Sequence, residues 1–115
     1  MNNFNETFER LNTLEFYLGG DNNDVPIKKN ALVNMRKLLI EIDKNDLIIP
    51  EVFPHYGGVG LQFEWEDDWY LEVDCSENNF EFLAVYKSDY KNAVSKDNLS
   101  LKDVLALLIE YLQKF

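Results

Sequence analysis

The chain has 115 residues, of which 46% are hydrophobic and 28% charged, and its formal net charge at pH 7 is −10. This length predicts one domain, residues 1–115, and the hydrophobic content excludes an intrinsically disordered chain, because apolar burial can offset the loss of chain entropy. The acidic balance argues against nucleic acid and anionic membranes as partners, since both repel a negative surface, and favours a basic protein partner.

Cysteine usage and the N-terminal residues indicate the compartment. The single Cys75 excludes an intramolecular disulfide and is expected to be a small apolar packing residue. The first residues show neither the basic region nor the apolar region of a signal peptide, and no apolar run approaches the ~18 residues of a membrane span. We therefore expect a soluble cytoplasmic protein.

Two helices are predicted in the first half of the chain. Apolar residues recur at the i, i+4, i+7 spacing over residues 4–18, which predicts a helix with one buried stripe. Asn23 or Asp24 is expected to cap a second helix with Pro26 in its first turn. This helix is expected to run to about Asp43, because Asn45 and Asp46 break it. Its wide apolar face consists of Ile27, Ala31, Leu32, Met35, Leu38, Leu39 and Ile42.

A meander of strands is predicted next. Residues 47–54 are expected to form an edge strand or an arm, because the two prolines there cannot donate ladder hydrogen bonds in a central strand. Apolar and polar residues then alternate over residues 59–65, 69–75 and 80–86, which predicts three antiparallel strands. The polar residues 87–98 are expected to be a connection to the last helix.

The length of the first hairpin loop determines the register of these strands. A three-residue loop at residues 66–68 places Phe63 opposite Leu71, so that register and hydrophobicity agree. The buried face is then expected to carry Val59, Leu61, Phe63, Trp65, Trp69, Leu71, Val73, Cys75, Phe80, Phe82, Ala84 and Tyr86. The opposite face is expected to carry Gln62, Glu64, Tyr70, Glu72, Asp74, Glu81, Leu83 and Val85.

The C-terminal helix has a clear start signal. Ser100 is expected to be its N-cap, with Asp103 at the third position of a capping box. Its buried stripe is predicted to be Leu101, Leu105, Leu108, Leu112 and Phe115. The sequence thus predicts an α+β fold with two N-terminal helices, a three- to four-stranded antiparallel meander and a C-terminal helix packed on one face of the sheet.

The negative charge is concentrated in the predicted sheet. Residues 50–86 hold nine of the 21 acidic residues and none of the 11 basic ones. An aromatic side chain among carboxylates and apolar neighbours, as at Tyr70, is typical of an interface anchor. The candidate partner-binding residues are therefore Glu64, Asp67, Asp68, Tyr70, Glu72, Asp74 and Glu81.

No catalytic, metal or cofactor site is predicted. His55 is the only histidine, and the acidic residues 66–68 lack the spacing of a calcium-binding loop. Carboxylate pairs across the sheet, such as Asp74 with Glu81, could act as acid and base only in a cleft that raises one pKa by burial. An exposed sheet face is not such a cleft, so we expect that the chain is not an enzyme.

Three segments carry a family resemblance. Residues 50–54, 57–65 and 70–74 together resemble a loose pattern in small bacterial immunity and antitoxin-type proteins, including those of contact-dependent growth inhibition systems. The resemblance implies a cytoplasmic protein that binds and blocks a cognate toxin, often a basic nuclease domain. No functional residue carries over from it.

The sequence is compatible with three functions. The first is an immunity protein whose acidic sheet covers the basic active-site cleft of a toxin, with carboxylates in place of substrate phosphates. The second is an acidic, secretion-chaperone-like protein that dimerises and holds an extended segment in apolar grooves. The third is a small enzyme that uses the carboxylates. The sequence favours the first and leaves the oligomeric state open.

Overall fold

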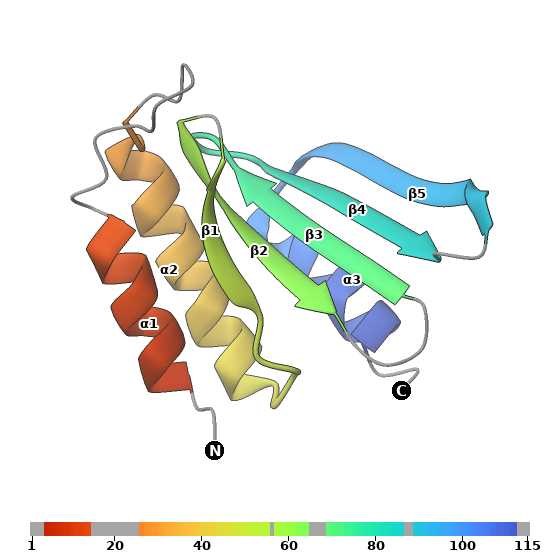
Figure 1. Ribbon diagram of the computed structural model, residues 1–115, viewed down its shortest axis with the longest axis horizontal. Coiled ribbons are helices and arrows are strands. Elements are labelled where there is room, and N and C mark those ends of the chain that lie inside the picture. Colours follow the sequence, from red (N-terminus) through yellow and green to blue (C-terminus); the bar gives the residue numbers. More distant parts are fainter. Residues whose placement is uncertain (1–3, 15–25, 56, 65–68, 87–88, 113–115) are drawn as a thin grey trace.

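The computed structural model describes residues 4–14, 26–55, 57–64, 69–86 and 89–112, and in these residues a five-stranded antiparallel sheet packs against helices (Figure 1). The strand order is β1-β2-β3-β4-β5. The elements are α1 (Phe4–Thr13), α2 (Lys29–Lys44), β1 (Glu51–His55), β2 (Gly58–Glu64), β3 (Trp69–Cys75), β4 (Phe80–Tyr86), β5 (Asp89–Leu99) and α3 (Leu101–Leu112). The predicted α+β class is confirmed.

Helix α2 begins later than the sequence predicts. Lys28 is the N-cap residue, with extended backbone and no side-chain cap hydrogen bond, and Pro26 therefore precedes the helix. The Lys28 backbone N–H donates to the carbonyl oxygen of Gly57 at 2.9 Å, which holds this segment extended against the turn between β1 and β2. Asn23 and Asp24, the expected caps, lie outside the described residues.

The end of α2 confirms the predicted break. Asp46 has a positive φ of 55°, and its N–H donates to the carbonyl of Asp43 at 3.1 Å. The N–H of the buried Leu47 donates to the carbonyl of Ile42 at 3.2 Å. These two bonds form a Schellman motif, which satisfies carbonyl groups at the helix end and turns the chain toward β1.

The register of the central strands agrees with the prediction. Phe63 lies opposite Leu71 and Leu61 lies opposite Val73, as a three-residue hairpin loop requires. The loop itself, residues 66–68, lies outside the described residues. Strand β1 pairs with β2 at the end of the strand order, which confirms the expected edge strand.

Strand β5 corrects the prediction of a polar connection and of three to four strands. It pairs antiparallel with β4 over most of the segment that was expected to be irregular. Its register shifts at two irregularities, and only Val94, opposite Ala84, is packed against the core from the middle of the strand. An edge strand with bulges and largely exposed side chains has no strict apolar alternation, so periodicity does not reveal it.

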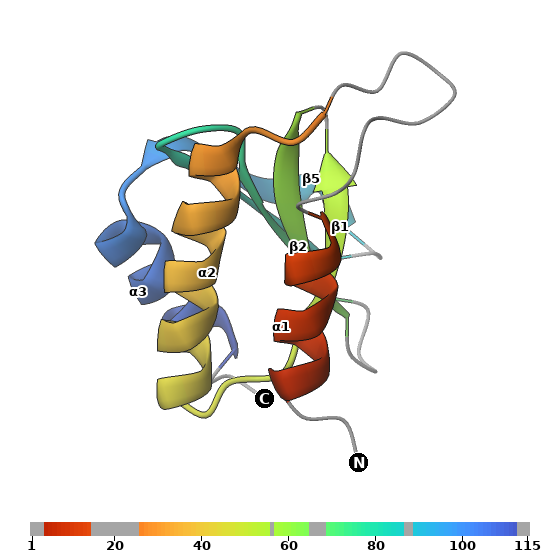
Figure 2. The same cartoon turned by 90° about the vertical axis from the view of Figure 1, so that its left-hand side faces the viewer.

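The helices lie on one side of the sheet and at one edge. Helix α2 contacts β2 and β3, and α3 contacts β4 and β5, so both cover the same face (Figures 1 and 2). Helix α1 contacts α2 and β1 and stands beside the β1 edge (Figure 2). The first helix therefore does not cover the centre of the opposite sheet face.

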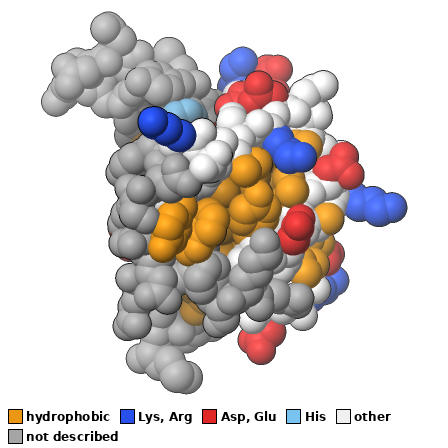
Figure 3. All heavy atoms as spheres, turned by 90° about the vertical axis from the view of Figure 1, so that its right-hand side faces the viewer, with side chains coloured by type: hydrophobic (Ala, Val, Ile, Leu, Met, Phe, Trp, Pro, Cys, Tyr) orange, Lys and Arg blue, Asp and Glu red, His pale blue; other side chains and the backbone are white. Residues whose placement is uncertain are grey.

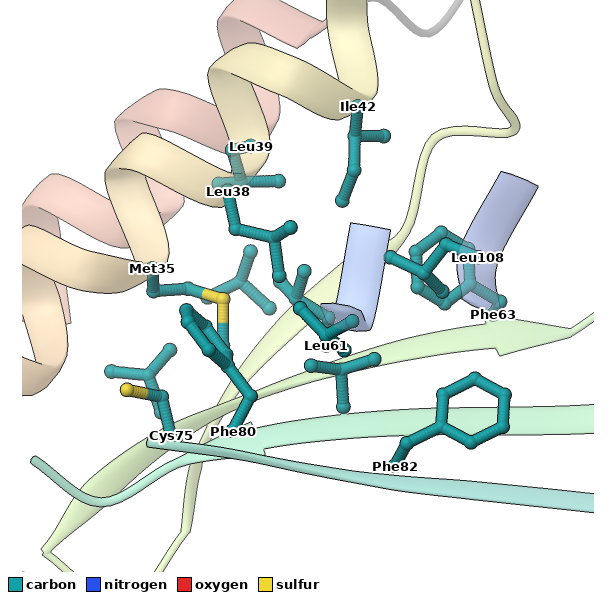
Figure 4. Close-up of a cluster of buried hydrophobic side chains, with 14 of the residues drawn as sticks. Met35, Leu38, Leu39, Ile42, Leu61, Phe63, Cys75, Phe80, Phe82 and Leu108 are labelled. Atoms are coloured by element: carbon teal, nitrogen blue, oxygen red, sulfur yellow. The ribbon is translucent and has the colours of Figure 1, made fainter. Parts of the chain in front are cut away.

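The core lies between the sheet and the two covering helices. Met35 and Leu38 of α2, Leu61 and Phe82 of the sheet and Leu108 of α3 are no more than 1% exposed and converge there (Figure 4). Burying a side chain of this kind contributes roughly 1.5–3 kcal/mol. Among the described residues, no helix is long and apolar enough to cross a membrane.

Helix α3 starts as predicted but presents a different stripe. The backbone N–H of Asp103 donates to Ser100 Oγ at 3.1 Å, which confirms the N-cap. Its buried residues are Val104, Leu108 and Leu112. The expected Leu101 and Leu105 are only partly buried, because α3 covers the last two strands, next to the edge of the sheet. Phe115 lies outside the described residues.

Candidate functional site

The sheet face opposite α2 and α3, called the outer face below, carries the residues that alternation predicts. The register aligns Gln62 with Glu72 and Leu83, Glu64 with Tyr70 and Val85, and Gly60 with Asp74 and Glu81. Strand β1 extends this face beyond the prediction. The outer-face residues of β1 to β4 that the structure describes are Glu51, Phe53, His55, Gly58, Gly60, Gln62, Glu64, Tyr70, Glu72, Asp74, Glu81, Leu83 and Val85.

Five of the seven predicted site residues share this face. Glu64 and Glu81 are exposed, whereas Tyr70, Glu72 and Asp74 are partly buried. Asp67 and Asp68 lie outside the described residues, so the structure does not place them. The predicted set thus divides into solvated carboxylates and a group of side chains that contact one another.

The contacting group, called the polar cluster below, consists of His55, Tyr70, Glu72 and Asp74. Tyr70 Oη donates a hydrogen bond of 2.6 Å to Glu72 Oε1. The carboxyl groups of Glu72 and Asp74 share a hydrogen bond. His55 Nε2 lies 3.7 Å from Asp74 Oδ2, an ion-pair distance that exceeds hydrogen-bond length.

Strand geometry assembles the polar cluster. Residues 70, 72 and 74 point to the same face of β3 because side chains alternate along a strand. Asp74 lies opposite Gly60, and Gly60 lies opposite Phe53. A Cβ atom at Gly60 would overlap the Phe53 ring and come within 2.7 Å of Asp74 Oδ1. Glycine at this position therefore allows the ring and the carboxyl group to lie together over β2.

Asp74 is the most enclosed carboxyl group of the outer face. Its side chain is 15% exposed, and its Oδ1 atom is buried without a hydrogen-bond partner. Burial raises the pKa of Asp74 to about 8, assisted by the hydrogen bond to Glu72 and by the negative charges of Glu72 and Glu81. At neutral pH Asp74 is thus mostly protonated and adds little to the negative charge.

Glu72 shifts in the opposite direction. Burial alone would raise the pKa of Glu72, but the hydrogen bonds from Asp74 and Tyr70 and the charge of His55 lower it overall. The pKa of Tyr70 is raised, first by burial and then by its hydrogen bond to Glu72. The pair of carboxyl groups therefore holds one proton near neutral pH, and Tyr70 stays a hydrogen-bond donor.

Sequence reasoning missed the part that β1 plays in this site. It treated His55 as an isolated histidine and the outer face as uniformly exposed. The signal was the short turn between β1 and β2, because antiparallel pairing across it places Phe53 and His55 on the same face as Gly60. The burial of Asp74 follows from that pairing.

A groove adjoins the outer face between α1 and the first two strands. Its volume is about 510 Å³. The lining residues are Glu6, Thr7, Arg10, Ile49, Pro50, Glu51, Val52, Phe53, Gln62 and Glu64. Phe53 lines the groove, and its ring also lies over Gly60, next to Asp74 of the polar cluster. The groove therefore extends the acidic surface toward α1 and adds one cation, Arg10, to it.

A second surface of different character lies at the other end of the sheet. Figure 3 shows a strip of hydrophobic side chains on the side of the molecule where β5 lies. Strand β5 contacts α3 and β4, and among the apolar side chains of these elements Val94 and Leu105 are partly buried and Tyr86 is 38% exposed. Tyr86 is thus more exposed than predicted, although it lies opposite Trp69 on the expected face and its ring packs against that indole.

Comparison of the chain with protein-family models, with curated proteins and with solved structures finds no match. The likeness of residues 50–54, 57–65 and 70–74 to immunity and antitoxin-type proteins therefore stays a prediction. What the chain does is inferred from the chemistry of its own surfaces.

Proposed function

We propose that this chain is an immunity-type binding protein that neutralises a basic toxin domain, such as a nuclease, by covering its active-site cleft with the outer face. The observation that supports this proposal is an acidic sheet face whose centre none of the three described helices covers. Strands β1 to β4 contain no Lys or Arg, so His55 is the one basic side chain that these strands bring to it. A field of one sign on a rigid surface steers a basic partner and orients it.

The charges available to a partner are those of the exposed carboxylates. Glu51, Glu64 and Glu81 come from three different strands and are exposed. Leu83 and Val85 lie among them, partly buried, and provide the apolar area that protein interfaces need. In this proposal the exposed carboxylates stand in for substrate phosphates, while Tyr70, Glu72 and Asp74 stiffen the surface between them.

Charge reversal tests the proposal. We expect Glu64→Lys combined with Glu81→Lys to slow association with a basic partner encoded by an adjacent gene by more than about tenfold at low salt. The matched control reverses two exposed acids on the helical side, Asp43 and Glu110, and so changes the net charge equally. Stopped-flow association rates from about 50 to about 300 mM salt separate the two variants.

The possible outcomes distinguish binding at the outer face from attraction by the net charge of the whole chain. If both double variants slow association equally, the net charge acts without a defined site. If neither variant changes the rate, the outer face is not the binding surface. Circular dichroism of both variants shows whether the fold is retained, which the exposure of the four side chains leads us to expect.

A secretion-chaperone-like protein is the second candidate, and the hydrophobic strip beside β5 favours it. Such a protein would dimerise and hold an extended segment against apolar side chains such as Val94 and Leu105. Sedimentation analysis of the purified chain tests this candidate, because a monomer at working concentration would contradict it.

The prediction that the chain is not an enzyme is kept. A protonated Asp74 beside an ionised Glu72 is the charge arrangement of an acid–base pair. However, neither Glu72 nor Asp74 lines the groove, and Asp74 Oδ1 is buried. The pair therefore does not lie in the cavity where a substrate would bind.

A further inference from the structure

We propose that His55, Glu72 and Asp74 form a binding site for a divalent transition-metal ion, with Zn²⁺ as the preferred ion. One donor atom of each residue, an imidazole nitrogen and two carboxylate oxygens, lies within 4.8 Å of the others. The inference is independent of the proposed toxin partner and differs from the sequence-based expectation of no metal site.

The distances are close to those of a coordinated ion. Ligand atoms at 2.0–2.2 Å from a tetrahedral Zn²⁺ ion lie roughly 3.3–3.6 Å apart. His55 Nε2 and Asp74 Oδ2 already lie 3.7 Å apart. Small side-chain rotations therefore suffice to bring these two donors and the Glu72 carboxylate around one ion.

The donor set selects the class of ion. An imidazole with two carboxylates suits Zn²⁺, Co²⁺ and Mn²⁺, whereas Ca²⁺ takes six to eight oxygen ligands and Mg²⁺ retains most of its water. Three protein ligands leave at least one coordination position for water or for a group from a binding partner. Cys75 points to the opposite face of β3 and is buried in the core, so it is not a competing ligand in the folded chain.

The surroundings of the three residues also fit a cation. Asp74 Oδ1 is buried without a hydrogen-bond partner, so the protein itself does not fully satisfy this carboxyl group. Gly60 provides the space that this oxygen occupies. Tyr70 Oη holds Glu72 by a 2.6 Å hydrogen bond, the kind of contact that orients a carboxylate ligand.

The experiment uses the full chain after removal of any affinity tag and dialysis against a chelator. Isothermal titration with ZnCl₂ near neutral pH is expected to give one ion per chain with a dissociation constant in the micromolar range or below. Titration with CoCl₂ is expected to give visible absorption without the sulfur-to-metal charge-transfer band of a thiolate ligand. No saturable binding up to about 1 mM Zn²⁺ would overturn the proposal.

Variants assign the ligands. His55→Gln and Asp74→Asn are each expected to weaken Zn²⁺ binding by more than about tenfold. The matched control is Glu81→Gln, which removes a carboxylate opposite Asp74 on the same face but outside the donor set, and it is expected to leave the affinity within about threefold. Equal loss in all three variants would show diffuse attraction to an acidic surface and would overturn the proposal.

Folding is checked separately. His55 lies on the edge strand and is partly exposed, so His55→Gln is expected to fold even if Asp74→Asn does not. Unchanged Zn²⁺ affinity in a folded His55→Gln variant would refute the site. Loss of affinity in Cys75→Ser, with retention in His55→Gln, would assign the ion to the thiol and would also refute it.

Discussion

The inner and outer faces of the same three strands differ in what determines their residues. Leu61, Val73 and Phe82 on the inner face are at most 1% exposed, and their packing against α2 and α3 allows only one register. Gln62, Glu72 and Leu83 are adjacent to these residues along the same strands; they form a row on the outer face and are only partly buried. Packing of the inner face therefore stabilises the fold, and the residues of the outer face are free to serve binding or chemistry.

The largest expected effect tests the inner face. Phe63→Ala removes a fully buried ring and is expected to lower the free energy of unfolding by about 3–5 kcal/mol. Leu83→Ala on the outer face is the control, and its cost is expected to be at most about 1 kcal/mol because that side chain is only partly buried. Urea denaturation measures both. Similar losses would mean that the two faces are not energetically distinct.

Gly60→Ala tests an outer-face position that is packed like the core. The new methyl group would overlap the Phe53 ring and approach Asp74 Oδ1, so a loss of about 1–3 kcal/mol is expected. Gln62→Ala, on the same strand and face, is expected to change stability by no more than about 0.5 kcal/mol. Adding Phe53→Ala to Gly60→Ala should recover part of the loss. Urea denaturation that shows additive effects instead would rule out this steric explanation.

Ser100→Ala weakens α3, which covers part of the inner face, and changes no residue of the sheet. The Asp103 N–H would lose its acceptor, and a loss of about 1 kcal/mol in the free energy of unfolding is expected. Thermal unfolding measures it. The control is Lys102→Ala, in the same first turn of α3. Lys102 is exposed, so this change should leave the melting temperature nearly unchanged.

The last expected effect is a pH dependence that originates on the outer face. Since the pKa of Asp74 is raised from 3.8 to about 8, its contribution to stability is complete below pH 3.8 and is lost as pH rises through 8. Glu72 has a lowered pKa and opposes this trend, because its contribution is lost as pH falls. Urea denaturation of chelator-treated protein across this range should show a downward slope that Asp74→Asn removes. A slope unchanged in that variant would exclude Asp74 as its origin.

The parts of the fold that depend on local pattern could be predicted, and those that depend on pairing across the chain could not. Alternation fixed the inner and outer faces of β2, β3 and β4 because burial imposes a period of two on each strand. Strand β5 was missed because an exposed edge strand carries polar residues and irregular pairing. The start of α2 was misplaced because a tertiary hydrogen bond from Lys28 to Gly57 determines it.

The strand face shared by five of the candidate residues was predicted, but the contacts among them were not. The alternation of side chains along each strand predicted one shared face, and the structure confirms it, for Glu64, Tyr70, Glu72, Asp74 and Glu81. Their pKa values and contacts depend on β1, whose Phe53 and His55 enclose Asp74 only after β1 pairs with β2. Long-range pairing of this kind has no periodic signature in a single sequence.

The position of α1 beside β1 affects how this protein can aggregate. A sheet grows into a fibre when each added chain offers a new unpaired edge, and α1 packs along one of the two edges here. Among the described elements, β5 is then the edge left for strand addition. Two chains joined through β5 would leave no edge for a third, so edge-to-edge growth of the folded protein ends at a pair.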